Sequence, residues 1–128
     1  MPEKNNVMVL YVDDEESNLF LFKVSFQSRY NILTAISPAE GLEKLEKYHD
    51  RIIVVISDMR MPQMNGIEFI ETAKNKFKNI FYYILTGYDY SEEIDQALKK
   101  DLIQNFFTKP FDTGEINQAI EHAIRHFD

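Results

Sequence analysis

Residues 52–58 read Ile-Ile-Val-Val-Ile-Ser-Asp, and residues 59–66 follow with Met-Arg-Met-Pro-Gln-Met-Asn-Gly. A continuous apolar, β-branched run bounded by turn residues is typical of a strand buried on both faces, as in parallel sheets covered by helices. Asp58 closes this run, and open α/β sheets bind ligands along the edge where their strands end. Aspartate is also a common turn residue. The way in which the other strands end therefore decides whether Asp58 is a site residue.

Length and composition restrict the class of protein. The 128 residues suffice for one domain, which we expect to span residues 1–128 without a linker or repeat. A hydrophobic content of 45% with 27% charged residues is typical of a folded globular protein. No apolar run is long enough to span a membrane, and residues 1–6 lack the basic and apolar regions of a signal peptide. We expect a cytoplasmic protein with no membrane partner.

Charge and cysteine content exclude further classes. Cysteine is absent, which excludes disulfides, thiolate metal sites and cysteine nucleophiles. The formal net charge of -7 would repel a phosphate backbone. The basic cluster Lys74, Lys76 and Lys78 lies at the end of a predicted helix, where it complements the helix dipole. We expect no direct binding to nucleic acid.

Apolar runs and cap residues predict five strands that alternate with five helices. Residues 37–40, Ser-Pro-Ala-Glu, have the pattern of a capping box, and Asn65 with Glu68 repeats it. The alternation predicts an α/β fold, a doubly wound parallel sheet with helices on both faces. The strands are expected at residues 7–12, 30–35, 52–58, 80–85 and 103–108, and the helices at 17–28 and from residues 37, 65, 91 and 112 onward.

Apolar residues at helical spacing predict the buried face of each helix. The first helix carries so many large apolar residues that we expect it to be buried over a broad front. The residues predicted to be buried are Leu19, Phe20, Leu21, Phe22, Val24 and Phe26; then Ala39, Leu42, Leu45 and Tyr48; then Ile67, Ile70, Ala73 and Phe77; then Ile94, Ala97 and Leu98; and finally Ile116, Ile120, Ala123 and Phe127.

Polar residues stand at the ends of the predicted strands. They are Asp13, Asp14, Asp58, Thr86 and Lys109, and a parallel sheet brings its strand ends to one edge. At an effective dielectric of about 20, each close pair of carboxylates costs several kcal/mol, so the three need a cation. Oxygen ligands favour Mg²⁺. With Mg²⁺ and Lys109 neutralising charge, Asp58 can attack the phosphorus of a donor and become an aspartyl phosphate, while Thr86 donates to a phosphoryl oxygen.

These residues match a known family. The chain resembles, over nearly its full length, the CheY-like receiver domain of bacterial two-component response regulators. One such motif alone is weak evidence, whereas four in order at the right strand ends are highly specific. The matching segments are Asp13-Asp14, residues 58–66 (Asp-Met-Arg-Met-Pro-Gln-Met-Asn-Gly), Thr86-Gly87 and residues 109–111 (Lys-Pro-Phe).

The resemblance implies a role for each residue. Asp58 would be the phosphoacceptor, Asp14 a direct Mg²⁺ ligand and Asp13 mainly the holder of a metal-bound water. The backbone carbonyl of Arg60 would complete the protein ligands, and Lys109, followed by a cis peptide bond to proline, would pair with the phosphoryl group. The implied fold is flavodoxin-like, with strand order 2-1-3-4-5 and the acids at the switch point between strands one and three.

The resemblance also implies partners and an output. A histidine kinase or phosphotransfer protein would supply the phosphoryl group, and a downstream protein or output domain would bind the face made by the fourth helix, fifth strand and fifth helix, with a phosphorylation-dependent homodimer as a further possibility. Thr86 and Phe106 would be the switch residues, although Phe106 can equally be an ordinary core or surface aromatic. Tyr88 is hypothesised to slow hydrolysis of the phosphoaspartate. Such a domain promotes its own phosphorylation and dephosphorylation and is not a turnover enzyme.

Three other functions fit parts of the pattern. A phosphatase of the haloacid dehalogenase type also uses a strand-end aspartate but needs a second acid two residues later, where this chain has Arg60. A flavin or nucleotide binder would need a glycine- or hydroxyl-rich loop in place of residues 13–16. A pseudo-receiver would lack an essential side chain, yet all are present. His122 and His126 share a helix face and are spaced to bind a metal, but no third ligand is evident in the sequence. Cations near a helix C-terminus are favourable in any case, which is the alternative explanation of these two residues.

Overall fold

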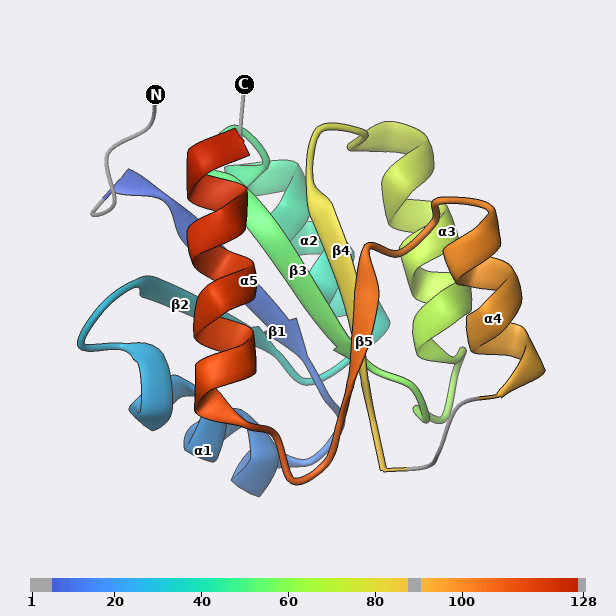
Figure 1. The fold of residues 1–128 in the computed structure, drawn as a ribbon, viewed down its shortest axis with the longest axis horizontal. Helices are drawn as coiled ribbons and strands as arrows, with labels where there is room; N and C mark the ends of the chain where they lie inside the picture. Colours follow the sequence, from blue (N-terminus) through green and yellow to red (C-terminus); the bar gives the residue numbers. More distant parts are fainter. Residues whose placement is uncertain (1–5, 88–90, 127–128) are drawn as a thin grey trace.

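The structure, a computed structural model, describes residues 6–87 and 91–126, in which five strands and five helices alternate (Figure 1). The predicted boundaries hold within two residues. The strands are β1 (Met8–Val12), β2 (Asn31–Ala35), β3 (Ile52–Asp58), β4 (Phe81–Thr86) and β5 (Asn105–Thr108). The helices are α1 (Glu16–Phe26), α2 (Pro38–Tyr48), α3 (Gly66–Lys76), α4 (Glu92–Lys99) and α5 (Thr113–His126).

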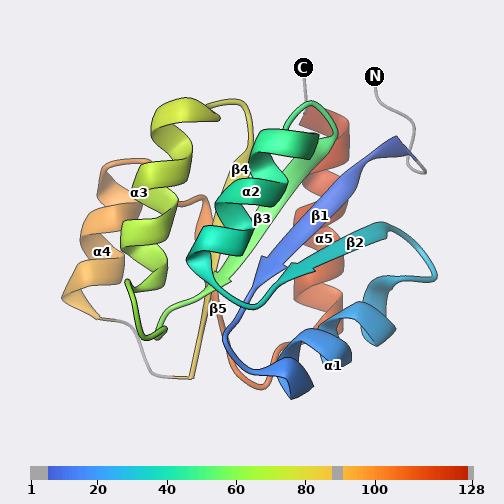
Figure 2. The ribbon, with the colours of Figure 1, turned by 180° about the vertical axis from the view of Figure 1, so that it is seen from behind.

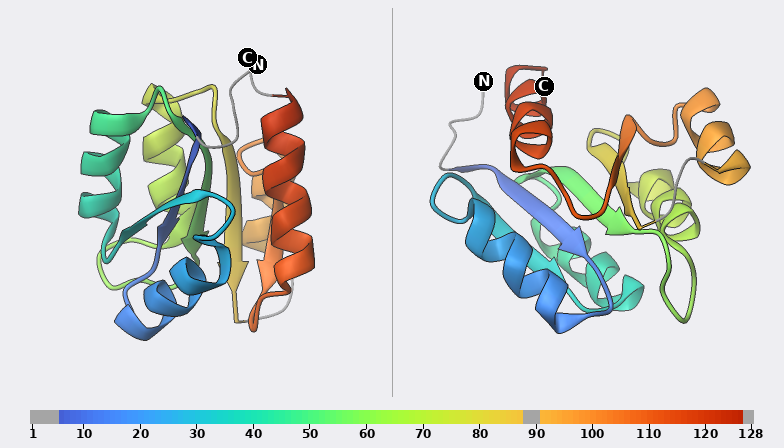
Figure 3. Two further views of the ribbon diagram at one scale, coloured as in Figure 1. Left: turned by 90° about the vertical axis from the view of Figure 1, so that its left-hand side faces the viewer. Right: turned by 60° about the horizontal axis from the view of Figure 1, so that its bottom comes forward.

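The strands form one parallel sheet in the order β2-β1-β3-β4-β5, as predicted. The strand arrows point to the same end of the molecule (Figure 3). The register aligns the strand ends, because Val12 pairs with Ser57, Asp58 pairs with Leu85 and Thr86 pairs with Thr108. The ends of β1, β3, β4 and β5 therefore meet at one edge.

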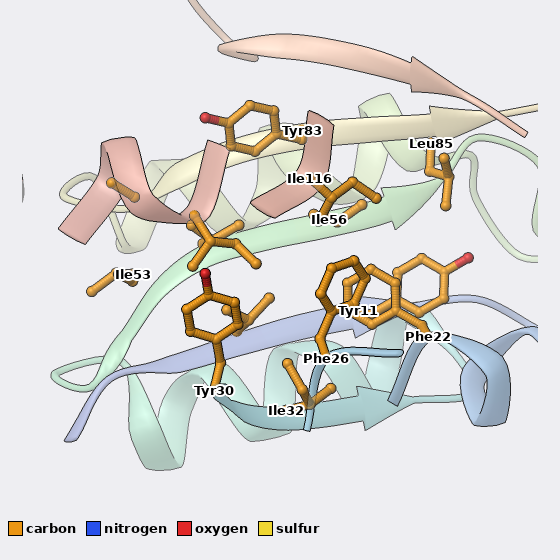
Figure 4. Close-up of a cluster of buried hydrophobic side chains, with 14 of the residues drawn as sticks. Tyr11, Phe22, Phe26, Tyr30, Ile32, Ile53, Ile56, Tyr83, Leu85 and Ile116 are labelled. Carbon is orange, nitrogen blue, oxygen red and sulfur yellow. The ribbon is translucent and has the colours of Figure 1, made fainter. Parts of the chain in front are cut away.

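Helices cover both faces of the sheet. Figure 1 shows α5 in front of the strands, and Figure 2, from behind, shows α2 and α3 in front of them. One apolar cluster joins the sheet to α1 and α5 (Figure 4), and a second joins it to α2, α3 and α4. No helix within residues 6–87 and 91–126 has the length and apolar character needed to cross a membrane.

The helix caps follow the sequence with one correction. Asn65 and Glu68 form the complete capping box at the start of α3, with bonds of 2.8 and 2.9 Å. Ser37 accepts from the Glu40 backbone at 3.1 Å, but the Glu40 carboxylate accepts at 3.4 Å from Ile36 instead of from the cap residue itself. The first hydrogen bond of the predicted capping box at α2 is therefore confirmed, and the second is wrong, because the Glu40 carboxylate accepts from the residue before the cap.

The prediction of a broadly buried α1 is wrong. Leu19, Phe22 and Phe26 are buried, whereas Phe20, Leu21 and Val24 are 72%, 54% and 46% exposed. The buried residues lie at spacings of three and four on one side of the helix, and a helix lying on a sheet buries only that side. Three large apolar side chains of α1 therefore face outward.

The predicted burial of Ala39 in α2 is also wrong, because this residue is exposed. The buried residues of α2 are Pro38, Gly41 and Leu45. A Cβ at Gly41 would lie 3.0 Å from the Phe69 ring, so the close approach of α2 to α3 selects a residue that hydrophobic periodicity does not register. Half-buried positions are Leu42, Tyr48 and Leu98, and Phe127 lies outside the described residues. The other predicted helix positions of α3, α4 and α5 are buried.

Candidate functional site

The polar residues predicted from the strand ends gather at one edge of the sheet. Asp13 follows β1, Asp58 ends β3, Thr86 ends β4 and Lys109 follows β5. Asp13, Asp58 and Thr86 are only 0%, 7% and 1% exposed, whereas Asp14 is exposed. Buried polar groups are rare in cores unless they are paired, so these buried side chains make this edge of the sheet the candidate site.

Three carboxylates gather beside one ammonium group, which contacts two of them. Asp13, Asp14 and Asp58 each offer an oxygen within 4.8 Å of the others. The Lys109 ammonium lies 3.1 Å from Asp58 Oδ1 and 3.3 Å from Asp13 Oδ2. Because one positive charge cannot neutralise three negative ones, the cluster favours a further cation, and an all-oxygen donor set fits Mg²⁺.

Asp13 is held by neutral donors that the sequence analysis did not identify. The Tyr11 hydroxyl donates to Asp13 Oδ2 at 2.5 Å, and the Asn18 amide donates to the same oxygen at 3.2 Å. The backbone N–H of Glu15 donates to Oδ1 at 2.9 Å. Residues two apart on a strand share a face, so the spacing of Tyr11 and Asp13 is a signal that the sequence does contain.

The surroundings of the site shift the pKa values of Asp58, Lys109 and Tyr11. Burial raises the pKa of Asp58, the Asp13 carboxylate raises it further, and the Lys109 ammonium works against both. Burial lowers the pKa of Lys109, but its ion pairs with Asp58 and Asp13 outweigh this and raise the pKa on balance. Burial and the nearby Asp13 charge raise the pKa of the Tyr11 phenol far above its ordinary value, so this hydroxyl remains a donor.

Gly66 brings the start of α3 against the end of β3. Its N–H donates to the Met59 carbonyl at 2.8 Å. A Cβ at this position would collide with the backbone oxygen of Asp58 and lie 2.8 Å from Ile84 Cδ1. Glycine is therefore required where the loop after Asp58 turns back into the helix. The exposed Arg60 lies in this loop.

The remaining predicted residues lie around these groups. Arg60 and Thr86 line a common cavity of about 420 Å³, which extends to the first turn of α4. The Lys109 backbone N–H donates to the Thr86 carbonyl at 2.7 Å, and the Lys109–Pro110 peptide bond is cis, as the resemblance implied. Phe106 is half-buried on β5 and packs against the cluster under α2, α3 and α4. Its switching role stays a prediction, and Tyr88 lies outside the described residues.

The geometry gives little support to the phosphatase alternative or to a metal site at His122 and His126. The Arg60 side chain, at the position where a dehalogenase-type phosphatase needs an acid, is exposed. The rings of His122 and His126 lie 4.4 Å apart between centroids. Within residues 6–87 and 91–126, however, Asp13, Asp14 and Asp58 are the one group of three or more acidic, histidine or cysteine residues close enough to hold a metal.

Comparison with known proteins identifies the family. The model of the response regulator receiver domain matches residues 9–121. The chain belongs to the response regulator receiver family. Receiver domains are phosphoacceptor signalling domains of two-component systems, and this chain is one of them. The acidic cluster of Asp13, Asp14 and Asp58 fits phosphorylation and Mg²⁺ binding.

Relatives match the receiver over most of its length. It is 32% identical to the alkaline phosphatase synthesis transcriptional regulatory protein PhoP of Bacillus subtilis, over 94% of the chain and 49% of PhoP. It is 30% identical to the sporulation initiation phosphotransferase F of the same organism, over 93% of the chain and 94% of that protein. The chain thus spans about half the length of PhoP, and 26% of the Escherichia coli transcriptional regulatory protein GlrR.

Solved receiver structures have the same fold. A response regulator receiver domain protein from Clostridium thermocellum superposes with a TM-score of 0.83 at 30% identity, covering 93% of this chain and 94% of that one. The Vibrio cholerae chemotaxis protein CheY4 superposes with a TM-score of 0.80 at 29% identity, covering 91% and 98%. The flavodoxin-like α/β fold is therefore confirmed.

Proposed function

We propose that this receiver, a single domain over residues 1–128, accepts a phosphoryl group on Asp58 from a histidine kinase or phosphotransfer protein in the cytoplasm. The observation that carries the proposal is the Lys109 ammonium, 3.1 Å from Asp58 within a cluster of three carboxylates at the strand ends. The ligands for Mg²⁺ would be Asp14, Asp58 and the backbone carbonyl of Arg60, with Asp13 holding a metal-bound water. Bound Mg²⁺ would supply positive charge that neutralises the Asp58 carboxylate and the incoming phosphoryl oxygens.

The protein's own residues have distinct parts in the transfer. An oxygen of Asp58 forms the bond to phosphorus, and the bond from phosphorus to the donor histidine nitrogen breaks, leaving its electron pair on that nitrogen. Lys109 favours the ionised form of Asp58 beforehand and then pairs with a phosphoryl oxygen. The buried Thr86 donates its hydroxyl to another phosphoryl oxygen. Self-catalysed loss of the phosphoryl group to water is part of the same proposal.

The donor would dock beside α1. A groove of about 530 Å³ runs between α1 and the segment after β5, and Leu21, Ser25, Lys109 and Phe111 line it. Lys109 contacts Asp58, so a donor seated on Leu21 would lie next to the acceptor. The exposed Phe20 and Val24 side chains would extend this apolar surface, and exposed apolar surface of this kind marks interaction sites.

The output would use the face formed by α4, β5 and α5. Thr86 would turn toward the phosphoryl group, and Phe106 would move inward behind it. The phosphoryl group needs to favour the active arrangement by only a few kcal/mol to make a minor state the major one. A downstream protein or output domain would bind this face, and a second copy of the receiver is a candidate partner. Size-exclusion chromatography with and without beryllofluoride distinguishes the homodimer.

Intact mass spectrometry tests the proposal. Acetyl phosphate with Mg²⁺ should add one phosphoryl group to the wild-type protein, with acetate as the leaving group, and should add none to Asp58→Asn. The exposed Asp50→Asn variant is the matched control and should be modified normally. Modification of Asp58→Asn to the wild-type extent would assign the acceptor elsewhere, and sustained hydrolysis of a phosphate monoester would favour the phosphatase alternative.

A further inference from the structure

We propose that Tyr11 is a positioning residue of the phosphorylation site, whose hydroxyl holds Asp13 in place while Lys109 changes partners. The inference rests on the proposed function, because it assumes that Lys109 turns from the carboxylates to the phosphoryl group. It concerns a tyrosine that is 1% exposed and donates at 2.5 Å to a carboxylate that is itself 0% exposed.

The Tyr11 ring is fixed by packing, so its hydroxyl has a defined place. The ring stacks on Phe22 with centroids 4.4 Å apart and planes inclined by 22°. Phe22 in turn contacts Phe26 and Phe111. Figure 4 shows the Tyr11 ring beside Phe22, with its hydroxyl directed toward the arrowheads of the strands. Asp13 follows β1 and Asp58 ends β3 at the same edge. Burial by α1 and the segment after β5 therefore aims this donor at Asp13.

Three donors converge on Asp13 Oδ2, and they differ in how firmly they are held. Lys109 donates at 3.3 Å but shares its ammonium with Asp58, and Asn18 donates at 3.2 Å from a half-exposed position. Tyr11 makes the shortest bond, from a fully buried ring. When Lys109 pairs with a phosphoryl oxygen, the buried Asp13 charge loses one donor, and leaving such a charge under-satisfied is costly. Tyr11 is the donor that remains in place.

Outer hydrogen bonds of this kind orient the groups that serve a metal, and their loss typically weakens metal binding by about 10- to 100-fold. Tyr11→Phe removes the hydroxyl and keeps the ring that packs on Phe22. We expect this variant to bind Mg²⁺ about 10-fold more weakly than wild type in isothermal titration calorimetry without a phosphodonor. Addition of beryllofluoride should widen the difference, because Lys109 is then engaged with the phosphoryl analogue.

Tyr82→Phe is the matched control. The buried Tyr82 hydroxyl donates at 2.7 Å to the Phe77 carbonyl and makes no contact with the acidic cluster. Both variants lose one buried phenolic hydrogen bond, so thermal unfolding in chelator reports the structural cost of each. A purely structural role for Tyr11 would lower stability in the same way but leave the Mg²⁺ dissociation constant unchanged.

The outcomes separate this inference from the function on which it rests. Wild-type affinity in Tyr11→Phe, while the wild-type protein binds Mg²⁺, would overturn the positioning role alone. A larger loss of affinity in Asn18→Ala than in Tyr11→Phe would also overturn it, by making the amide the main holding group. A wild-type protein that binds no Mg²⁺ would overturn both the proposed function and this inference. Weaker binding in Tyr11→Phe with unchanged binding in Tyr82→Phe supports the inference.

Discussion

Neutralising Asp58 should stabilise the metal-free protein. At an effective dielectric of about 20, two unit charges at the 4.8 Å limit of the cluster repel by about 3.5 kcal/mol, and the 3.1 Å pair with Lys109 attracts by about 5 kcal/mol. The exposed Asp14 adds a screened repulsion, and burial adds a desolvation cost. Burial, the dominant effect, tips the balance, because together with Asp13 and Asp14 it raises the pKa of Asp58 in spite of Lys109. We expect Asp58→Asn to raise the free energy of unfolding in chelator by about 1 kcal/mol at pH 7.

The pH dependence has a defined sign. Because burial and Asp13 raise the pKa of Asp58, the folded protein binds this proton more tightly than the unfolded chain does. The resulting stabilisation is lost as the pH rises from the unfolded pKa through the raised folded pKa. The advantage of Asp58→Asn over wild type should therefore appear across that interval and be absent at lower pH, where both side chains are neutral.

Urea unfolding in chelator and in excess Mg²⁺ measures both effects. Binding at a Mg²⁺ concentration 100 times the dissociation constant stabilises a protein by about 2.7 kcal/mol, so wild type should overtake Asp58→Asn when Mg²⁺ is added. The exposed Asp50→Asn variant is the control and should follow wild type in both conditions. If Asp58→Asn is less stable than wild type in chelator, or if Mg²⁺ stabilises both equally, then the charge balance worked out from the cluster is wrong.

Three more outcomes follow from the packing and the charges. Gly66→Ala should lower the free energy of unfolding by about 2–3 kcal/mol, because its Cβ would meet the backbone of Asp58, whereas Gly87→Ala should be nearly neutral, since a Cβ there meets nothing within 4 Å; denaturant unfolding compares them. Lys109→Met should cost about 3 kcal/mol at pH 7, because two buried carboxylates lose their shared ammonium. The raised pKa of Lys109 means that this difference from wild type is complete below the unfolded pKa and disappears as the pH rises through the folded one, so an undiminished difference in unfolding at strongly alkaline pH would contradict the ion pairs. Replacing Phe20 and Val24 by serine should change stability by less than about 0.5 kcal/mol but slow phosphotransfer from the cognate donor protein roughly tenfold, with labelling by acetyl phosphate unaffected; equal phosphotransfer rates would remove α1 from the donor surface.

Much of the fold could be predicted from the sequence, because the signals for its strands and helices are local and mutually consistent. Continuous β-branched runs such as residues 52–58 identify buried strands, and alternation with capped helices restricts the connections to right-handed crossovers. The strand ends then follow, so the sequence alone predicts Asp13, Asp58, Thr86 and Lys109 at one edge of the sheet. Their roles in phosphorylation remain predictions that the experiments above test.

The errors arose where a side chain's neighbours come from elsewhere in the chain. Phe20 and Val24 look like core residues by composition, yet only the face of α1 that rests on the sheet is buried. Gly41 carries no hydrophobic signal, although the crossing of α2 over Phe69 requires it. Tyr11 reads as one more apolar strand residue, and its spacing of two from Asp13 is a local signal that the apolar pattern of the strand conceals.

The position of β5 at the edge of the sheet affects how much of the time Lys109 lies beside Asp58. This strand has four residues, lies at the sheet margin and pairs with β4 alone, yet it leads directly into Lys109. Peripheral segments with few partners open at lower free energy than a protein's centre does. Transient fraying of β5 would withdraw the only ammonium in contact with Asp58 among the described residues while the rest of the sheet stays intact. Hydrogen exchange at residues 105–108 would then report how often β5 opens and Lys109 leaves the site. A partner that binds β5 would change the occupancy of the complete site without contacting the acidic residues.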